Sequence, residues 1–472
     1  MKRKSIIIIA LISSFVATGC FNSKEKSTPD AIEAELDKIS EIVSYKKLKT
    51  SKYYKSVYKI EFRQYIDHED HSLGTFTQSL EFGYNALTCP TVLVTEGYYD
   101  AGHHYRYTND EAELAYLLNC NYLSMEHRYF GNSLPVKINY DDVHTWDYLT
   151  TEQAANDAHA VVTAFKKILS GKWLSTGASK SGMTTEMYAY YFPGDVDLYV
   201  PYVAPFCISR HDARMVKFIY EEAGDLQYGE SRARELRNEV LQFQLKLIEY
   251  RDVLAPQIYQ EGIEAGITFN SYTNADNLYD MLILDCGIGF WQYYQTYRSL
   301  ERTLALPETT PEEIANKQAS CASYLKSIVS VYDCDPHSAL FPYYIQAYQE
   351  LGNYKYDFQY LRNAMTGDMT LSVTEEEEDD LCWNMMFNES MLELEQKDLM
   401  YENINNMLAT TDLQFVILYG SSDPWYAVRP DDVTRDNINI YVNKNNPHTT
   451  SISNFDADET KEILDKIKSI LE

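Results

Sequence analysis

Strand-like and helix-like segments alternate along the chain between residues 56 and 205. Residues 56–66 and 74–84 are rich in β-branched and aromatic side chains and flank a polar turn, which predicts an antiparallel hairpin. Four further apolar runs predict buried strands, at 91–97, 121–127, 172–176 and 196–205. The intervening segments have helical apolar spacing, at 110–120, 150–170 and 182–192. This alternation is typical of a mostly parallel sheet with helices on both faces.

From residue 207 to about residue 405 the pattern becomes helical, and no convincing strand interrupts it. Strand patterns return at 413–420 and 438–444, and an amphipathic helix closes the chain. A sheet that is interrupted by helices after its sixth strand and then completed by two more strands has the layout of an α/β-hydrolase. We therefore predict an α/β-hydrolase fold, with core segments at 46–206 and 406–472. A large helical cap domain at 207–405 is inserted after the sixth core strand.

The first 19 residues have the features of a secretory signal. Three basic residues precede an apolar run that is too short to span a bilayer, and three small residues lead into Cys20. A cysteine in that position resembles a bacterial lipobox, so we expect a lipoprotein signal peptide at 1–19, lipidation of Cys20 and a lipidated tether at 20–45. The alternative is an ordinary cleaved signal with a chance cysteine. The expected location is the bacterial cell envelope, anchored to the membrane on the periplasmic side or the outer surface.

The formal net charge of −29 argues against nucleic acid as a partner, because a polyanion would be repelled. An acidic surface favours cationic ligands, among them the free amino terminus of a peptide. The eight cysteines form no CxxC motif, and the adjacent His103 and His104 cannot both face one ion from a regular element. We therefore expect no metal centre and no cofactor.

Ser179 lies between a predicted buried strand and a predicted helix. Gly177 precedes it by two residues, and the small residues Ser181 and Gly182 follow it. A nucleophile elbow requires small neighbours, because its backbone is strained and the adjoining strand and helix approach each other closely. Ser179 is therefore the candidate nucleophile, although a small-residue turn without chemistry has the same pattern.

A histidine and an acid follow Ser179 in the order that α/β-hydrolases use. His448 is the only histidine after the last long strand pattern, and it lies in a polar loop. Asp423 follows the strand pattern at 413–420 and precedes Pro424. The plainer alternatives are a solvated loop histidine and an aspartate that only stabilises a turn.

These three residues predict acyl transfer. His448 would take the hydroxyl proton of Ser179 and return it to the leaving amine, while Asp423 fixes the imidazole tautomer. The oxyanion requires two donors. One is expected to be the backbone N–H of Lys180, and the other an N–H from the loop after the third strand, at Gly97 or Tyr98.

Several longer strings are more specific than Gly-x-Ser. They are TGASKSGMT at 176–184, YVAPF at 202–206, GSSDPW at 420–425, EHRYFGNSLP at 126–135 and YLTTEQAANDAHAV at 148–161. The chain thereby resembles the secreted bacterial prolyl tri- and tetrapeptidyl aminopeptidase family, which is related to lysosomal prolyl carboxypeptidase and dipeptidyl peptidase II. The likeness covers about 90–205 and 413–450, and no motif in the cap matches.

Carried over position by position, the resemblance implies that Ser179, Asp423 and His448 form a catalytic triad on an α/β-hydrolase core. One position departs from the family. Its elbow usually reads Ser-Lys-Gly-Gly-Met, whereas this chain has Ser181 in place of the first glycine.

The sequence predicts a serine exopeptidase that releases short peptides from the N-terminus of oligopeptides, with a possible preference for cleavage after proline. Its partners would be peptides with a free N-terminus and, through the lipid at Cys20, a membrane. One alternative is a lipase or carboxylesterase that uses the same triad, and another is a non-catalytic lipoprotein that binds peptides. The residue preferred at the scissile bond, the length released, the disulfides and the oligomeric state stay open.

Overall fold

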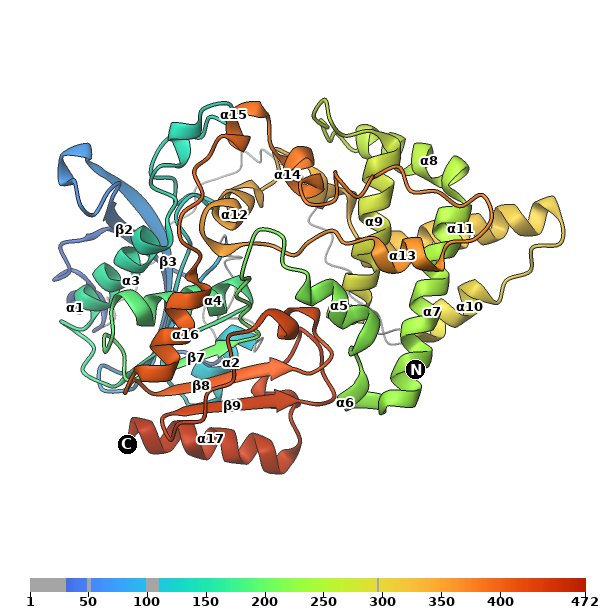
Figure 1. Ribbon diagram of the computed structural model, residues 1–472. Coiled ribbons are helices and arrows are strands. Elements are labelled where there is room, and N and C mark those ends of the chain that lie inside the picture. Colours follow the sequence, from blue (N-terminus) through green and yellow to red (C-terminus); the bar gives the residue numbers. More distant parts are fainter. Residues whose placement is uncertain (1–30, 49–51, 99–109, 295–296) are drawn as a thin grey trace, which may run out of the picture.

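The computed structural model describes residues 31–48, 52–98, 110–294 and 297–472 (Figure 1). Within them a nine-stranded sheet has the order β1-β2-β3-β5-β4-β6-β7-β8-β9. The strands are β1 Ile42–Lys47, β2 Ser56–Tyr65, β3 Thr75–Tyr84, β4 Thr91–Thr95, β5 Asn121–Met125, β6 Trp173–Ala178, β7 Leu198–Tyr202, β8 Phe415–Gly420 and β9 Ile438–Asn443.

The sheet changes from antiparallel to parallel along its width. Strands β1, β2, β3 and β5 pair antiparallel, and every pair from β5 through β9 is parallel. The predicted hairpin is confirmed, with Ser56 opposite Tyr84 and Tyr65 opposite Thr75. Apart from the added edge strand β1, the order and the single exchange of β4 and β5 are those of an α/β-hydrolase. The carboxyl ends of the parallel strands therefore meet at one edge, where such sheets bind ligands.

Helices cover both faces of the sheet, as the alternating pattern predicted. The helices α3 Thr151–Phe165, α4 Lys180–Tyr191 and α16 Met400–Thr410 contribute to one buried apolar cluster. On the other face, α2 Asp110–Leu117 and α17 Ala457–Leu471 contribute to a second. Each sheet face is thus shielded from water, which fixes the ends of the parallel strands in a rigid frame.

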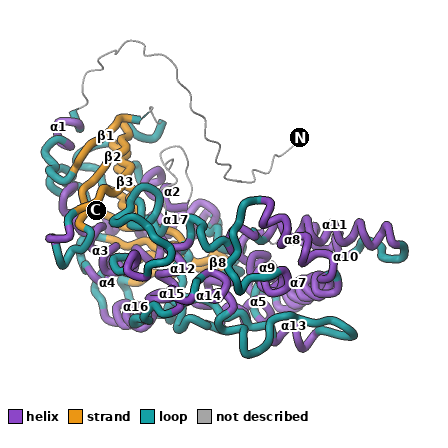
Figure 2. The backbone as a smooth tube through the Cα atoms, turned by 90° about the horizontal axis from the view of Figure 1, so that it is seen from above, coloured by secondary structure: helices purple, strands orange, loops and turns teal. Residues whose placement is uncertain are grey.

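A helical insertion lies between β7 and α16 and extends away from the sheet in both views (Figures 1 and 2). Its buried residues form a third apolar cluster, which Trp146 and Leu149 of the core also join. The helices are α5 Arg214–Glu221, α6 Asp225–Tyr228, α7 Glu230–Glu249, α8 Arg251–Glu264, α9 Ala275–Gly289, α10 Tyr297–Leu304, α11 Pro311–Ile328, α12 Phe341–Gln346, α13 Gln359–Ala364, α14 Leu381–Met386 and α15 Glu389–Leu392.

The amino-terminal segment differs from the expected tether. Residues 33–36 form α1 Glu33–Leu36, and residues 42–47 form the edge strand β1. Ile32, Leu36 and Ile39 are at most 3% exposed and pack in the same cluster as α3 and α4. Burial of apolar surface is favourable, so at least residues 31–45 belong to the folded domain rather than to a tether.

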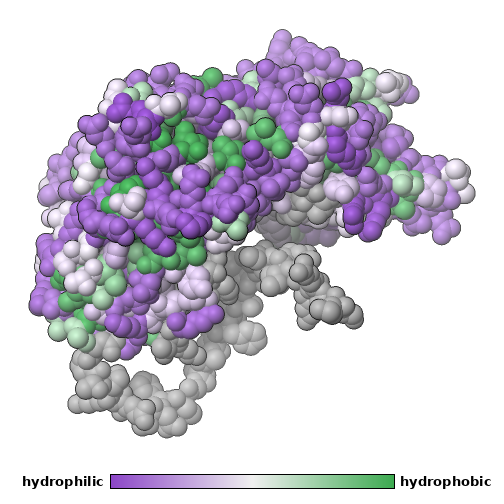
Figure 3. Space-filling view, turned by 90° about the horizontal axis from the view of Figure 1, so that it is seen from below, coloured by the Kyte–Doolittle hydropathy of each residue, from purple (hydrophilic) through white to green (hydrophobic). Residues whose placement is uncertain are grey.

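The proposed signal peptide and the lipidation site Cys20 lie outside the described residues. Within the described part of the chain, no helix is both long enough and apolar enough to cross a bilayer. The face seen from below is mostly hydrophilic and carries only small apolar patches (Figure 3).

Candidate active site

Ser179 occupies a strained turn between β6 and α4. Its backbone has φ 59° and ψ −122°, a conformation that side-chain-bearing residues rarely adopt. A Cβ on Gly177 would lie 2.4 Å from the carbonyl oxygen of Ser181, and one on Gly182 would lie 2.7 Å from that of Tyr202. The glycines therefore allow strand and helix to meet tightly, and the turn has the geometry of a nucleophile elbow.

His448 and Asp423 lie in direct contact beyond the ends of β9 and β8. The Nδ1 of His448 is 2.7 Å from Oδ2 of Asp423, and the two side chains are 6% and 0% exposed. The other oxygen of Asp423 accepts the N–H of Trp425, which fixes the carboxylate. A Cβ on Gly420 would lie 2.1 Å from the carbonyl oxygen of Pro447, so glycine at the end of β8 lets the histidine loop approach.

Ser179 lines a cavity, and His448 contacts two other residues of the cavity wall. The N–H of His448 donates to the carbonyl oxygen of Gln292 over 3.2 Å, and its ring meets the ring of Tyr293 edge-on at 5.7 Å. Gln292 and Tyr293 line the cavity together with Ser179. Across the described residues, no hydrogen bond joins the Ser179 hydroxyl to the imidazole. The structure thus brings His448 and Asp423 into contact and sets Ser179 at the wall of the adjacent cavity.

Gly97, in the loop after β4, does not have the role of oxyanion donor that the sequence predicted for it. Its N–H donates to the Oγ of Ser181 over 2.8 Å, so that donor is directed at the elbow rather than at a substrate. Tyr98 lines the cavity with Ser179, and its carbonyl oxygen accepts the N–H of His127 over 3.0 Å. The N–H groups of Lys180 and Tyr98 remain the predicted oxyanion donors.

The side chain of Lys180 binds the next peptide unit of the same loop, between Gly97 and Tyr98. Its Nζ donates to the carbonyl oxygen of Gly97 over 2.6 Å and lies 5.5 Å from the ring centres of Tyr98 and Phe130. Burial lowers the pKa of this lysine to about 7, while the charge of Glu350 opposes the shift. Lys180 and Ser181 therefore hold Gly97 against the elbow from both sides. Sequence reasoning assigned a role only to the backbone of Lys180.

The string from Glu126 to Pro135 supports this loop rather than entering the cavity. Oε2 of Glu126 accepts the hydroxyl of Ser133 over 2.6 Å, and the guanidinium of Arg128 binds both oxygens of Asp157 at 2.7 and 2.8 Å. Burial, with the nearby charge of Lys180, holds the pKa of His127 well below its usual range. His127 is therefore a neutral neighbour of the loop after β4.

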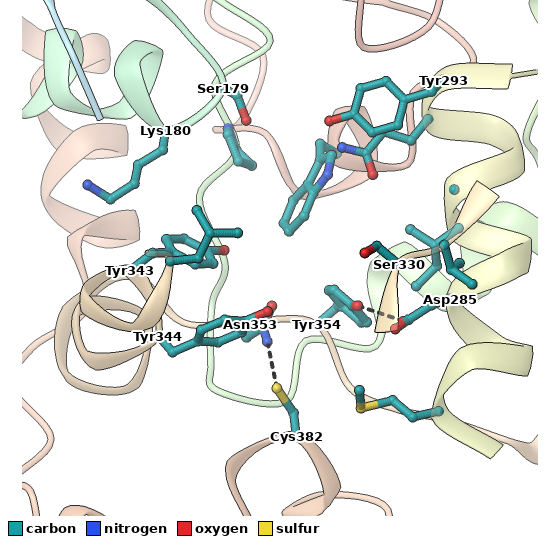
Figure 4. A pocket seen from close by; sticks show the side chains of 18 of the residues that line it. Ser179, Lys180, Asp285, Tyr293, Ser330, Tyr343, Tyr344, Asn353, Tyr354 and Cys382 are labelled. Atoms are coloured by element: carbon teal, nitrogen blue, oxygen red, sulfur yellow. Dashed lines mark hydrogen bonds between the residues drawn. The ribbon is translucent and has the colours of Figure 1, made fainter. Parts of the chain in front are cut away.

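The cavity lies between the elbow and the helical insertion, and its volume is about 360 Å³ (Figure 4). Aromatic and aliphatic side chains dominate its wall, and among the lining residues that the structure describes, Lys180 supplies a basic side chain and Asp285 an acidic one. Asp285, Tyr354 and Tyr356 come from the insertion, and no sequence motif pointed to them. Over the described residues, no cluster of three or more potential metal ligands occurs.

Comparison with known proteins finds a similar aminopeptidase. The sequence is 28% identical over 294 residues to a prolyl tri/tetrapeptidyl aminopeptidase of Streptomyces mobaraensis. This match covers 62% of the chain but only 57% of the relative, so the chain spans little more than half of that protein's length.

Two solved structures are also similar. One is a proline iminopeptidase of Mycobacterium smegmatis, with 13% identity, a TM-score of 0.34, and coverage of 84% of this chain and 97% of that one. The other is a 2-hydroxy-6-oxo-6-phenylhexa-2,4-dienoate hydrolase of Rhodococcus, with 10% identity, a TM-score of 0.34, and coverage of 88% and 99%. The sequence matches the family described as PS-10 peptidase S37 over residues 27–459. Because that match extends over most of the chain, the protein belongs to the S37 peptidase family.

Proposed function

We propose that the protein is a serine exopeptidase that releases short peptides from the N-terminus of oligopeptides. The observation that carries this proposal is the buried His448–Asp423 pair, 2.7 Å apart, beside a cavity whose wall includes the strained Ser179. Membership of a peptidase family and the similarity to an aminopeptidase support peptide bonds as the target.

In the proposed reaction Ser179 attacks the carbonyl carbon of the scissile bond. Because Nδ1 of His448 faces Asp423, Nε2 is the nitrogen that takes the serine proton. The bond between nucleophile and base is often long without substrate and tightens when substrate binds. The N–H groups of Lys180 and Tyr98 stabilise the oxyanion, and His448 returns the proton to the leaving amine.

Water then attacks the acyl-enzyme in the second half of the reaction. His448 takes a proton from the water and gives it to Ser179 Oγ as the ester bond breaks. The products are a free carboxylic acid, which is the amino-terminal peptide, and the regenerated enzyme. Cleavage after proline is part of the proposal, because the S. mobaraensis relative is named for prolyl substrates.

Hydrolysis of peptide arylamides and of acyl esters tests the proposal. The wild type should cleave arylamides, and Ser179→Ala should reduce kcat by several orders of magnitude with the fold intact. Ser469→Ala, on the exposed face of α17, is the matched control and should keep full activity. Preference for esters would favour a lipase or carboxylesterase, and activity retained in Ser179→Ala would contradict the mechanism.

We also propose that Cys20 is lipidated and anchors the protein to the bacterial cell envelope. The support is the arrangement of basic, apolar and small residues before Cys20. Incorporation of labelled palmitate into the wild type but not into Cys20→Ala, with loss of the variant from the membrane fraction, is the expected result. Equal membrane association of both proteins would contradict the anchor.

A further inference from the structure

The cavity beside Ser179 has a basic side chain on one side and an acidic side chain on the other. Lys180 belongs to the elbow, whereas Asp285 lies on α9 of the helical insertion, on the opposite side of the cavity (Figure 4). Most of the wall between them is aromatic or aliphatic, with a few uncharged polar side chains. An extended ligand with a positive end is therefore favoured with that end toward Asp285 and away from Lys180.

Two tyrosine hydroxyls position the carboxylate of Asp285. Tyr354 donates to Oδ1 over 2.8 Å, Tyr356 lies 3.4 Å from Oδ2, and the two hydroxyls are 2.9 Å apart. Burial and the negative charge of Asp285 hold the pKa of both tyrosines well above the usual range, so they remain donors. Hydrogen bonds to a carboxylate favour its ionised form, and each of its oxygens can accept more than one donor.

The cavity also has the right chemistry for the part of a peptide that Ser179 would acylate. In acyl transfer, the amino-terminal part of the substrate stays bound as the acyl group while the remainder leaves. In an exopeptidase that releases short peptides from the N-terminus, that part ends after a few residues in an α-ammonium group, which carries three donors and a positive charge. Asp285 is only partly buried, so it can be reached from the cavity.

We propose that Asp285 binds the α-ammonium group of the first substrate residue and so makes the enzyme an aminopeptidase. This inference rests on the proposed function. Asp285 then determines specificity, because the span from its carboxylate to Ser179 sets how many residues the acyl group contains. Tyr354 and Tyr356 are positioning residues that aim the carboxylate into the cavity.

The test combines two enzymes with two substrates. One substrate is a tripeptide arylamide with proline next to the arylamide, and the other is its des-amino analogue, in which hydrogen replaces the α-ammonium group. A hydrogen bond to a charged group is worth a factor of roughly 10–100, so the wild type should prefer the amine by that factor in kcat/KM. Asp285→Asn should lose most of this preference, because its kcat/KM should fall for the amine substrate and stay unchanged for the des-amino analogue. Asp252→Asn, an exposed acid on α8, is the matched control and should keep the wild-type ratio.

Labelling of Ser179 by a neutral fluorophosphonate separates the possible failures. Normal labelling and hydrolysis, with an unchanged amine preference in Asp285→Asn, would contradict the Asp285 assignment while the proposed function stands. Absence of labelling and of hydrolysis in the wild type would contradict both.

A second measurement uses only the wild type and remains valid if Asp285→Asn does not fold. The tripeptide acid, which is the product, and its des-amino analogue are compared as competitive inhibitors of arylamide hydrolysis. The ammonium-bearing product should inhibit at a concentration roughly 10- to 100-fold lower. Equal inhibition constants would overturn the proposal.

Discussion

The backbone N–H of Gly97 donates a hydrogen bond to the side-chain Oγ of Ser181 over 2.8 Å. Ser181 lies in the first turn of the helix that begins after Ser179, where the elbow of the resembling family usually has glycine. A glycine could not accept this bond. The serine therefore links the loop after β4 to the elbow and fixes how Tyr98 faces the cavity.

Ser181→Ala should slow turnover. The variant leaves the buried N–H of Gly97 without this acceptor, which typically costs about 1–3 kcal/mol. We expect kcat to fall about 10-fold with little change in KM, because the loop would hold the oxyanion less firmly. Steady-state kinetics should be compared with those of Ser175→Ala, which removes a buried hydroxyl that lacks a partner among the described residues. Equal kcat in the two variants would contradict the positioning role of Ser181.

Replacement of the buried Lys180 should change how stability depends on pH. Its pKa of about 7 lies below the ordinary value of 10.5, so the unfolded chain binds more protons between these values. Stability from this group therefore rises with pH above about 7. The free energy of unfolding of the wild type minus that of Lys180→Met should increase by about 1 kcal/mol per pH unit between pH 7 and 9. Urea unfolding of both proteins at three pH values measures this difference in the free energy of unfolding. A difference that stays constant with pH would show that Lys180 is not desolvated.

Glu186 should destabilise the fold at neutral pH. Both of its carboxylate oxygens are buried without a hydrogen-bond partner among the described residues, and burial raises its pKa to about 8. A raised pKa means that the stability present below about pH 4.5 is lost as pH rises toward 8. Glu186→Gln should therefore increase the free energy of unfolding at pH 7.5 by about 1–3 kcal/mol, and by less at pH 5. Glu312→Gln, an exposed change on α11, serves as the control. A gain that is equal at both pH values would contradict this explanation.

Asp423→Asn should preserve the fold and remove most of the activity. The amide can hydrogen-bond to the imidazole but favours the wrong tautomer and cannot stabilise its charged form. We expect kcat to fall by roughly 10³–10⁴-fold. Asp431→Asn, an exposed substitution eight residues later, should change kcat by less than about 2-fold. Comparable activity in the two variants would exclude Asp423 as the residue that orients His448.

The core of the fold could be predicted because its signals are local. Each apolar run that predicts a strand is bounded by turn residues, and Gly177 and Ser179 mark the elbow within one decapeptide. The contact between Asp423 and His448 could be expected from chain order, because parallel strands end at the same edge of the sheet.

Other features depend on contacts that the sequence does not display. Residues 230–255 have continuous helical apolar spacing, but the structure breaks the helix at Tyr250, between α7 and α8. Residues 343–365 have the same kind of spacing, but Gly352, with a φ of 74°, ends the helix there. The edge strand β1 has no fully buried side chain, so it lacks the apolar run that marked the other strands, and its pairing with β2 holds it in the sheet.

The same holds for two parts of the site. The N–H of Gly97 is bound by a side chain 84 positions away, and Asp285 meets Tyr354 across 69 positions of a cap that has no motif. Neither contact has a local signal, so only the three-dimensional arrangement reveals it.

The most direct measurement of the central claim is the site and rate of covalent modification by a fluorophosphonate, read by peptide mass spectrometry. The claim is that His448 and Asp423 activate Ser179. It predicts a single phosphonylated residue, Ser179, in the wild type, and a rate at least about 100-fold slower in a folded His448→Ala variant. Modification at another serine, or an unchanged rate in His448→Ala, would contradict the account.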